Sequence, residues 1–146
     1  MNRRRVAPLL GAALVAPAAA RAAAGAEPLR YVLHVGGADP ALMEVAIGNI
    51  RNILATGPAP IVLVANGLGY TMLRADTSPV RADVEAVLRE HPAVVFAACQ
   101  NSRAAVARRE GKAPADIPEI AGVTDVPAGI VKLAELQAQG WAYIRV

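Results

Sequence analysis

Cysteine, histidine and aromatic residues are scarce in this 146-residue sequence, and each shortage removes a class of site. A single cysteine, Cys99, excludes an internal disulfide framework, because a disulfide needs two. The two histidines, His34 and His91, are far apart in the sequence, so the chain lacks the clustered ligands of a zinc site. We therefore expect no bound metal ion.

Several nucleotide-binding and catalytic motifs are also missing. The sequence contains neither GxGxxG nor GxxxxGKS/T, the glycine-rich cradles for dinucleotides and nucleoside triphosphates. The motif GxSxG, which forms the nucleophile elbow of α/β-hydrolases, is absent as well. Nothing in the sequence calls for an organic cofactor, and we expect none.

The first 26 residues have the composition of a secretory signal peptide. The basic run MNRRR is followed by the apolar stretch VAPLLGAALVAPAAA and by RAAAGA, which offers small residues before a cleavage point. Pro8, Gly11 and Pro17 interrupt the apolar stretch, which is too short and broken for a good membrane span. We predict cleavage after AGA, which leaves Glu27 first, with an uncleaved anchor as the main rival. The expected location is periplasmic or exported through the Sec route, and twin-arginine export is the looser fit.

The positive charge of the chain comes from this N-terminal segment. The full chain carries a formal charge of +3, but residues 27–146 hold 11 Lys and Arg against 12 Asp and Glu, which gives −1. The few aromatic residues are not interleaved with a basic stripe, so we exclude nucleic-acid binding. We also expect no stable membrane insertion after cleavage.

Residues 27–146 are expected to form one domain, since a chain of about 120 residues can bury a single core. Apolar runs at about residues 29–35, 60–65 and 93–98 predict buried strands, and a helical pattern follows each run. The last segment, GVTDVPAGIVKLAELQAQGWAYIRV, predicts a short strand, a helix and a final strand. This alternation predicts a three-layer α/β sandwich around a mainly parallel sheet of about five strands, in an order that the sequence does not reveal.

Three expected strands end in polar or glycine-rich turns, HVGGAD, ANGLG and ACQNS. If the strands are parallel neighbours, these turns share the sheet edge where ligands of open α/β sheets bind. Cys99 would then lie just before a helix, whose N–H groups and dipole favour a thiolate. Asn101 or Ser102 would cap that helix and could hydrogen-bond a substrate. A buried and inert Cys99 is the competing interpretation, because free cysteine is among the most buried residue types.

Other residues of the same edge are candidates for shaping a substrate-binding pocket. Asn66 ends the second expected strand, and Gly36 and Gly37 form the turn after the first. His34 lies near the end of the first strand, where it could act as a base or bind a substrate. A lone histidine in an apolar strand is, however, more often a hydrogen-bonded structural residue, and this alternative stays open.

The segments VLHVGGADP, AIGNIRNIL, IVLVANGLG, VVFAACQNS and GVTDVPAGIVKLAELQAQGWAYIRV together resemble the DsrE/DsrF-like family, most closely its small exported members. The likeness covers residues 29–146. It implies a flavodoxin-like α/β fold and homo-oligomers, often trimers or hexamers. Well-understood relatives carry sulfur as a persulfide on one cysteine within sulfur-oxidation or tRNA-thiolation relays, and Cys99 matches that cysteine by position. The relay proteins are cytoplasmic, whereas this chain is predicted to be exported.

Three functions are open on the sequence, and so is the question whether the protein is an enzyme. In the first, Cys99 takes sulfane sulfur from a donor, holds it as a persulfide without a metal or organic cofactor, and yields it to an acceptor thiol. In the second, the protein is a non-catalytic oligomeric module that binds a small ligand or partner protein at the same edge. In the third, Cys99 is a redox sensor that forms a disulfide between subunits.

Overall fold

The computed structural model describes residues 27–146, and the predicted signal peptide, residues 1–26, lies outside the described residues. Five strands form one parallel sheet in the order β4-β3-β2-β1-β5. Their bounds are β1 Tyr31–Val35, β2 Ile61–Ala65, β3 Val94–Cys99, β4 Thr124–Val126 and β5 Ala142–Arg145. The predicted α/β sandwich with a parallel sheet is confirmed.

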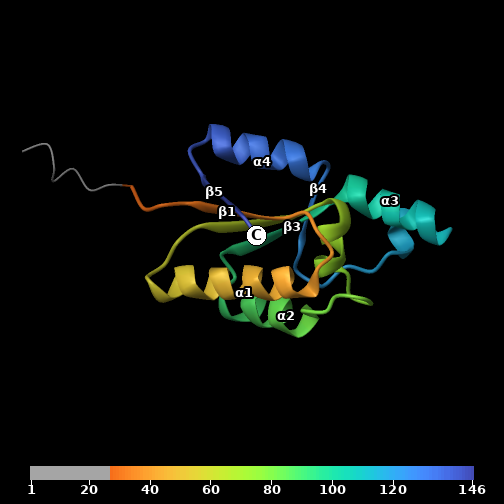
Figure 1. Cartoon of the computed structure of the whole chain (residues 1–146), viewed down its shortest axis with the longest axis horizontal. Coiled ribbons are helices and arrows are strands. Elements are labelled where there is room, and N and C mark those ends of the chain that lie inside the picture. The colour runs from red at the N-terminus through yellow and green to blue at the C-terminus, as the bar shows by residue number, and fades with distance from the viewer. Residues whose placement is uncertain (1–26) are drawn as a thin grey trace, which may run out of the picture.

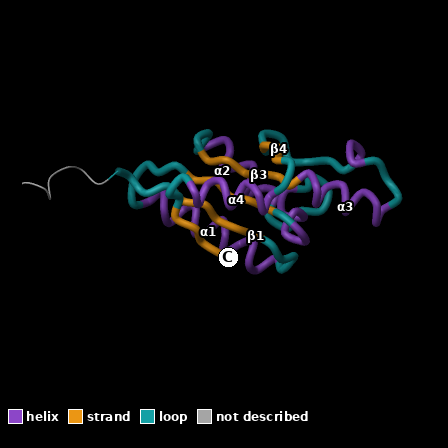
Figure 2. The backbone as a smooth tube through the Cα atoms, turned by 90° about the horizontal axis from the view of Figure 1, so that it is seen from above, coloured by secondary structure: helices purple, strands orange, loops and turns teal. Residues whose placement is uncertain are grey.

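Helices cover both faces of this sheet (Figure 1). The helical elements are α1 Pro40–Ala55, η2 Gly67–Leu73, α2 Arg81–Glu90, α3 Gln100–Glu110, η3 Pro114–Asp116 and α4 Gly129–Ala138, with η2 and η3 being 3₁₀ helices. α1 and α2 lie on one face and α4 on the other, while α3 projects at the end toward which the strands run (Figures 1 and 2). No helix in the described part of the chain is long and apolar enough to cross a membrane.

Local sequence signals account for α1. The Asp39 side chain accepts a hydrogen bond of 3.0 Å from the Ala41 N–H, and Pro40 occupies the first helical position. The buried residues of the helix follow its turn, so that one side packs on the sheet; they are Met43, Ala46, Ile47 and Ile50.

The sheet separates two cores. Leu63 and Phe96 contribute to the larger core, which α1 and α2 cover. Val62 and Ala97 point to the other face and join a smaller core with Leu133 of α4. β2 is buried along its whole length, because a central parallel strand is covered on both faces.

The strand order creates a switch point between β1 and β5. The chain proceeds from β1 through β2 and β3 to β4, and then returns through α4 to place β5 on the other side of β1. Right-handed crossovers put α4 on the face opposite α1 and α2 when the direction reverses. Ligands of open α/β sheets bind at the carboxyl ends of the strands beside such a switch point. The ends of β1, β2 and β3 are therefore the first place to look for a site.

Candidate functional site

The carboxyl ends of β1, β2 and β3 bring the predicted turns together. The Asn66 N–H donates to the Val35 carbonyl over 3.1 Å, which joins the turns after β2 and β1. The Gly67 N–H donates to the Ser102 hydroxyl over 2.7 Å, which joins the turn after β2 to the first turn of α3. The three turns therefore share one edge of the sheet, as the sequence led us to expect.

Cys99 lies where β3 passes directly into α3. It is the last residue of the strand and the N-cap residue of the helix, and 4% of it is exposed. The N–H of Gly129, the first residue of α4, donates to Cys99 Sγ over 3.2 Å. The N-termini of α3 and α4 therefore meet at this sulfur, and both helix dipoles favour a negative charge there.

The surroundings of Cys99 act on its pKa in opposite directions. Burial raises the pKa of the thiol, because a thiolate is poorly stabilised away from water. Hydrogen bonds from the Ser102 hydroxyl and from the backbone N–H groups of Gly129, Ser102 and Asn101 lower it. The hydrogen bonds outweigh the burial, so the pKa of Cys99 lies below its ordinary value. The site is suited to holding an anionic sulfur.

Asn101 and Ser102 do not cap α3, which corrects the prediction from the sequence. The helix begins earlier, at Gln100, with Cys99 in the cap position. Asn101 is exposed, and its N–H donates to the Pro127 carbonyl over 3.2 Å. Ser102 is buried, and its hydroxyl bonds to Cys99 and accepts from the Gly67 N–H. Both residue types are common helix caps. No loop separates β3 from α3, however, so Cys99 takes the cap position and Asn101 and Ser102 lie inside the helix.

Gly129 is a site residue that the sequence analysis missed. A Cβ atom at this position would lie 2.8 Å from Asn66 Cβ and 3.3 Å from Cys99 Cβ. Only glycine lets α4 begin close enough for its first N–H to reach the sulfur. The sequence held one signal for Gly129: a glycine stands at the start of a predicted helix, at a position where no turn requires a glycine.

A second group of side chains adjoins the switch point. The Tyr143 hydroxyl lies 2.8 Å from His34 Nδ1, and His34 Nε2 lies 2.9 Å from Asn66 Oδ1. The predicted residues His34 and Asn66 are thus in direct contact, and Tyr143 of β5 is an unpredicted third member. The alternating pattern of the last strand showed that Tyr143 had a definite face, but only the strand order shows that β5 lies beside β1.

The two glycines of the turn after β1 differ in their surroundings. A Cβ at Gly36 would lie 3.3 Å from His34 Nε2 and 3.6 Å from Asn66 Oδ1, so Gly36 borders the His34–Asn66 contact. A Cβ at Gly37 would meet nothing within 4 Å. Of the predicted pair, Gly36 is therefore the one that limits the space around the site.

A partly buried polar network supports the start of α3. Glu119 accepts hydrogen bonds from the Tyr70 hydroxyl over 2.7 Å and from Gln100 Nε2 over 3.2 Å. It also pairs with Arg103 over 3.2 Å. Burial, followed by the contact with Glu119, raises the pKa of Tyr70, which therefore stays protonated. The network fastens the segment before β4 to the helix that begins at Cys99, and its residues gave no motif in the sequence.

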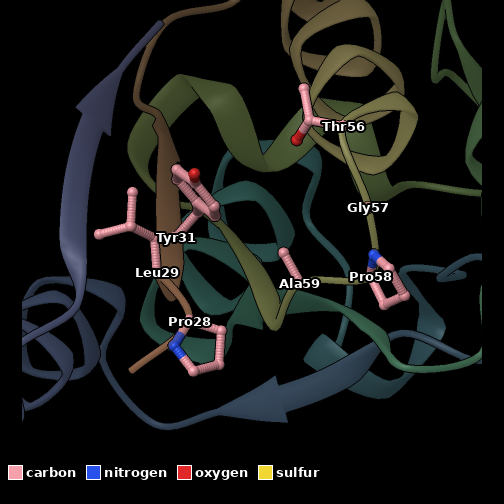
Figure 3. A pocket seen from close by; sticks show the side chains of 7 residues that line it. All are labelled: Pro28, Leu29, Tyr31, Thr56, Gly57, Pro58 and Ala59. Carbon is pink, nitrogen blue, oxygen red and sulfur yellow. The ribbon is translucent and has the colours of Figure 1, made fainter. Parts of the chain in front are cut away.

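One hollow of about 260 Å³ adjoins the site at the end of β4 and the start of α4, and it is lined by Val126, Pro127, Ala128, Val131, Lys132 and Glu135. Other hollows of the described surface lie at the opposite end of the sheet. The pocket in Figure 3, of about 180 Å³, lies at the amino ends of the strands, between the start of β1 and the loop after α1. It is lined by Pro28, Leu29, Tyr31, Thr56, Gly57, Pro58 and Ala59. Its side chains offer two hydroxyl groups and no acid, base or thiol. Within residues 27–146 no group of three or more His, Cys, Asp and Glu side chains could hold a metal ion.

Comparison with known proteins gives a likeness to a solved structure. No family model and no curated protein matches the chain. A solved structure, described as the protein of unknown function MTH1491 from Methanobacterium thermoautotrophicum, is 32% identical and superposes with a TM-score of 0.68. The match covers 81% of this chain and 99% of the archaeal chain. It therefore spans nearly the whole of that protein.

Proposed function

We propose that this chain, which belongs to the same family as the archaeal protein MTH1491, is an exported sulfur-handling protein. In this proposal the chain carries sulfane sulfur as a persulfide on Cys99, and the surroundings of that cysteine support the role. We also propose that the chain is a DsrE/DsrF-like protein. We further propose that it assembles into the homo-oligomer, a trimer or hexamer, that this likeness implies. It also includes export directed by residues 1–26.

One observation carries the proposal, which is the convergence of two helix N-termini on the Cys99 sulfur. Gly129 of α4 donates its N–H to Sγ over 3.2 Å, and the Ser102 hydroxyl and the N–H groups in the first turn of α3 further lower the pKa of Cys99. Such a set of fixed donors stabilises a thiolate, which is the form of the cysteine that attacks a sulfur donor. A cysteine that serves only to fill space in a core has no need of these donors.

The chemistry is a transfer of sulfur between thiols. The Cys99 thiolate attacks the outer sulfur of a donor persulfide, R–S–SH, and a new S–S bond forms on Cys99 as the bond within the donor breaks. The donor leaves as R–S⁻ with the electron pair of the broken bond and takes a proton from water. An acceptor thiolate then removes the outer sulfur from Cys99 by the same step. No external oxidant or reductant enters, so the carrier needs no metal or organic cofactor.

Mass spectrometry of the intact protein tests the proposal. We expect protein incubated with inorganic polysulfide and then desalted to gain the mass of one sulfur atom, and a thiol reductant to remove it. Cys99→Ser should abolish the gain and leave the thermal unfolding temperature little changed, because serine fits the space of cysteine. Equal loading of the wild type and of Cys99→Ser would overturn the proposal.

The burial of Cys99 favours a second candidate, a non-catalytic module that binds a small ligand or a partner at the same edge. With 4% of the residue exposed, the thiol can be reached only by a small reagent or after a local opening. This candidate predicts that native Cys99 reacts with iodoacetamide far more slowly than a free thiol at neutral pH, and that it gains no sulfur from polysulfide. Reaction at or above the rate of a free thiol would rule the candidate out.

A further inference from the structure

The chain of contacts from Tyr143 through His34 to Asn66 has a defined direction of hydrogen bonding. Asn66 meets His34 through its carbonyl oxygen, Oδ1, which can only accept a hydrogen bond. His34 Nε2 must therefore carry a proton and donate it. In the neutral ring Nδ1 is then the acceptor, and the Tyr143 hydroxyl, 2.8 Å away, is its donor. The partner on each side fixes the tautomer of His34.

This bonding fixes the orientation of the Asn66 amide. β1 and β3 flank β2 on opposite sides, and Asn66 directly follows β2. With its oxygen bonded to His34 of β1, the amide keeps its NH₂ group for another partner. Asn66 Cβ and Cys99 Cβ, at the ends of the neighbouring strands β2 and β3, both border the position of Gly129. The side chain of Asn66 therefore begins beside that of Cys99.

The thiolate itself already has its donors in α3 and α4. A persulfide is longer by one S–S bond, about 2.05 Å, so its charged outer sulfur lies beyond those donors. We propose, on the basis of the sulfur-carrying function above, that the Asn66 amide donates to the outer sulfur of the Cys99 persulfide. His34 is the positioning residue that holds the amide in this orientation, and Tyr143 fixes the tautomer of His34.

Two substitutions of His34 separate positioning from mere packing. Glutamine can place its amide NH₂ near the location of His34 Nε2 and keep the donor to Asn66, whereas asparagine is too short to do so. His91→Asn, made at the residue that ends α2, is the matched control. Asn66→Asp keeps the acceptor for His34 but removes the NH₂ group. Each variant is loaded with inorganic polysulfide, desalted, and followed by intact mass for the lifetime of the added sulfur, alongside the pKa of the unloaded thiol.

We expect His34→Asn and Asn66→Asp to shorten the lifetime of the added sulfur about ten- to a hundredfold, the worth of one hydrogen bond to a charged group. His34→Gln should restore most of it, His91→Asn should match the wild type, and the thiol pKa of His34→Asn should be close to that of the wild type. Asn66→Asp decides the question if His34→Asn does not fold.

Three results would overturn the inference. A wild-type lifetime in His34→Asn or in Asn66→Asp would show that the amide does not hold the outer sulfur. Equal losses in His34→Gln and His34→Asn would show that the donor to Asn66 is not what matters. A wild-type protein that takes up no sulfur would overturn the sulfur-carrying function, and this inference with it, whereas the first two results leave that function standing.

Discussion

The two ends of the sheet contrast in shape and in chemistry. At the amino ends of the strands the surface is hollowed, as in Figure 3, but the lining residues are mostly apolar or proline. At the carboxyl ends the polar side chains are close-packed around Cys99. A larger hollow at the amino ends, of about 360 Å³, includes Glu90 and His91 in its lining, but it contains no thiol. The function proposed for Cys99 depends on donors that converge on one atom, and such an arrangement needs no large cavity.

Gly129→Ala should have the largest effect at the carboxyl end. The added methyl group would meet Asn66 Cβ at 2.8 Å, so α4 must shift away from the sulfur. We expect the free energy of unfolding to fall by roughly 1–3 kcal/mol and the pKa of Cys99 to rise as the Gly129 N–H is lost. Urea denaturation and the pH dependence of alkylation measure the two effects.

Gly48→Ala in α1 is the matched control for that substitution. A Cβ at Gly48 would meet nothing within 4 Å, and alanine favours a helix interior. This variant should be more stable than the wild type by up to about 1 kcal/mol, with the Cys99 pKa unchanged. A rise of the Cys99 pKa in Gly48→Ala equal to that in Gly129→Ala would contradict the role given to Gly129.

Ser102→Ala should have the next largest effect. The substitution removes a hydroxyl group that lowers the pKa of Cys99 and accepts from the Gly67 N–H, so this pKa should rise. The free energy of unfolding should fall by about 1 kcal/mol, as for one lost hydrogen bond. Ser78→Ala, which loses a hydroxyl bonded to the Met72 carbonyl, should cost a similar amount and leave the pKa unchanged.

The ion pair between Arg74 and Glu110 should make the free energy of unfolding depend on pH in the acid range. The Arg74 guanidinium, hydrogen-bonded to Glu110, holds the pKa of that carboxyl at about 2, below its ordinary value of 4.5. Because the folded pKa is lowered, the stabilisation is complete above pH 4.5 and is lost as the pH falls toward 2. Urea denaturation across this range should show the decline, and Glu110→Gln should flatten it. An equally steep decline in the variant would assign it to other carboxylates.

The smallest effect is expected at the amino ends. Ala59→Leu fills part of the pocket in Figure 3. It should change the free energy of unfolding by less than about 0.5 kcal/mol and leave the rate of Cys99 alkylation unaltered. A clear change in the rate of Cys99 alkylation would show that the two ends of the sheet are coupled, which would contradict their separate roles.

Local patterns in the sequence predicted most of the fold. The continuous apolar runs before Gly36, Asn66 and Cys99 identified three buried strands, and the Asp39–Pro40 pair identified the start of α1. The strand order was not predictable, because pairing is decided by crossover packing between segments distant in the sequence. Without the order, β5 could not be placed beside β1, and Tyr143 could not be assigned to the site.

The candidate site was predicted in part. The edge of the sheet and the neighbourhood of Cys99 followed from parallel strands that end in polar turns. Gly129 was missed because its requirement comes from Asn66 and Cys99, which lie on other elements. The prediction that Asn101 or Ser102 caps α3 was wrong because only the three-dimensional structure shows that β3 continues directly into α3.

The direct passage of β3 into α3 also limits how the gene can vary in length. Side chains alternate between the faces of a strand, so Cys99 faces α4 together with Ala97, while Phe96 and Ala98 face the other core. Deleting one residue within β3 would turn the sulfur toward α1 and α2, away from Gly129. To keep the sulfur facing Gly129, the number of residues from Val94 to Cys99 can change only in steps of two.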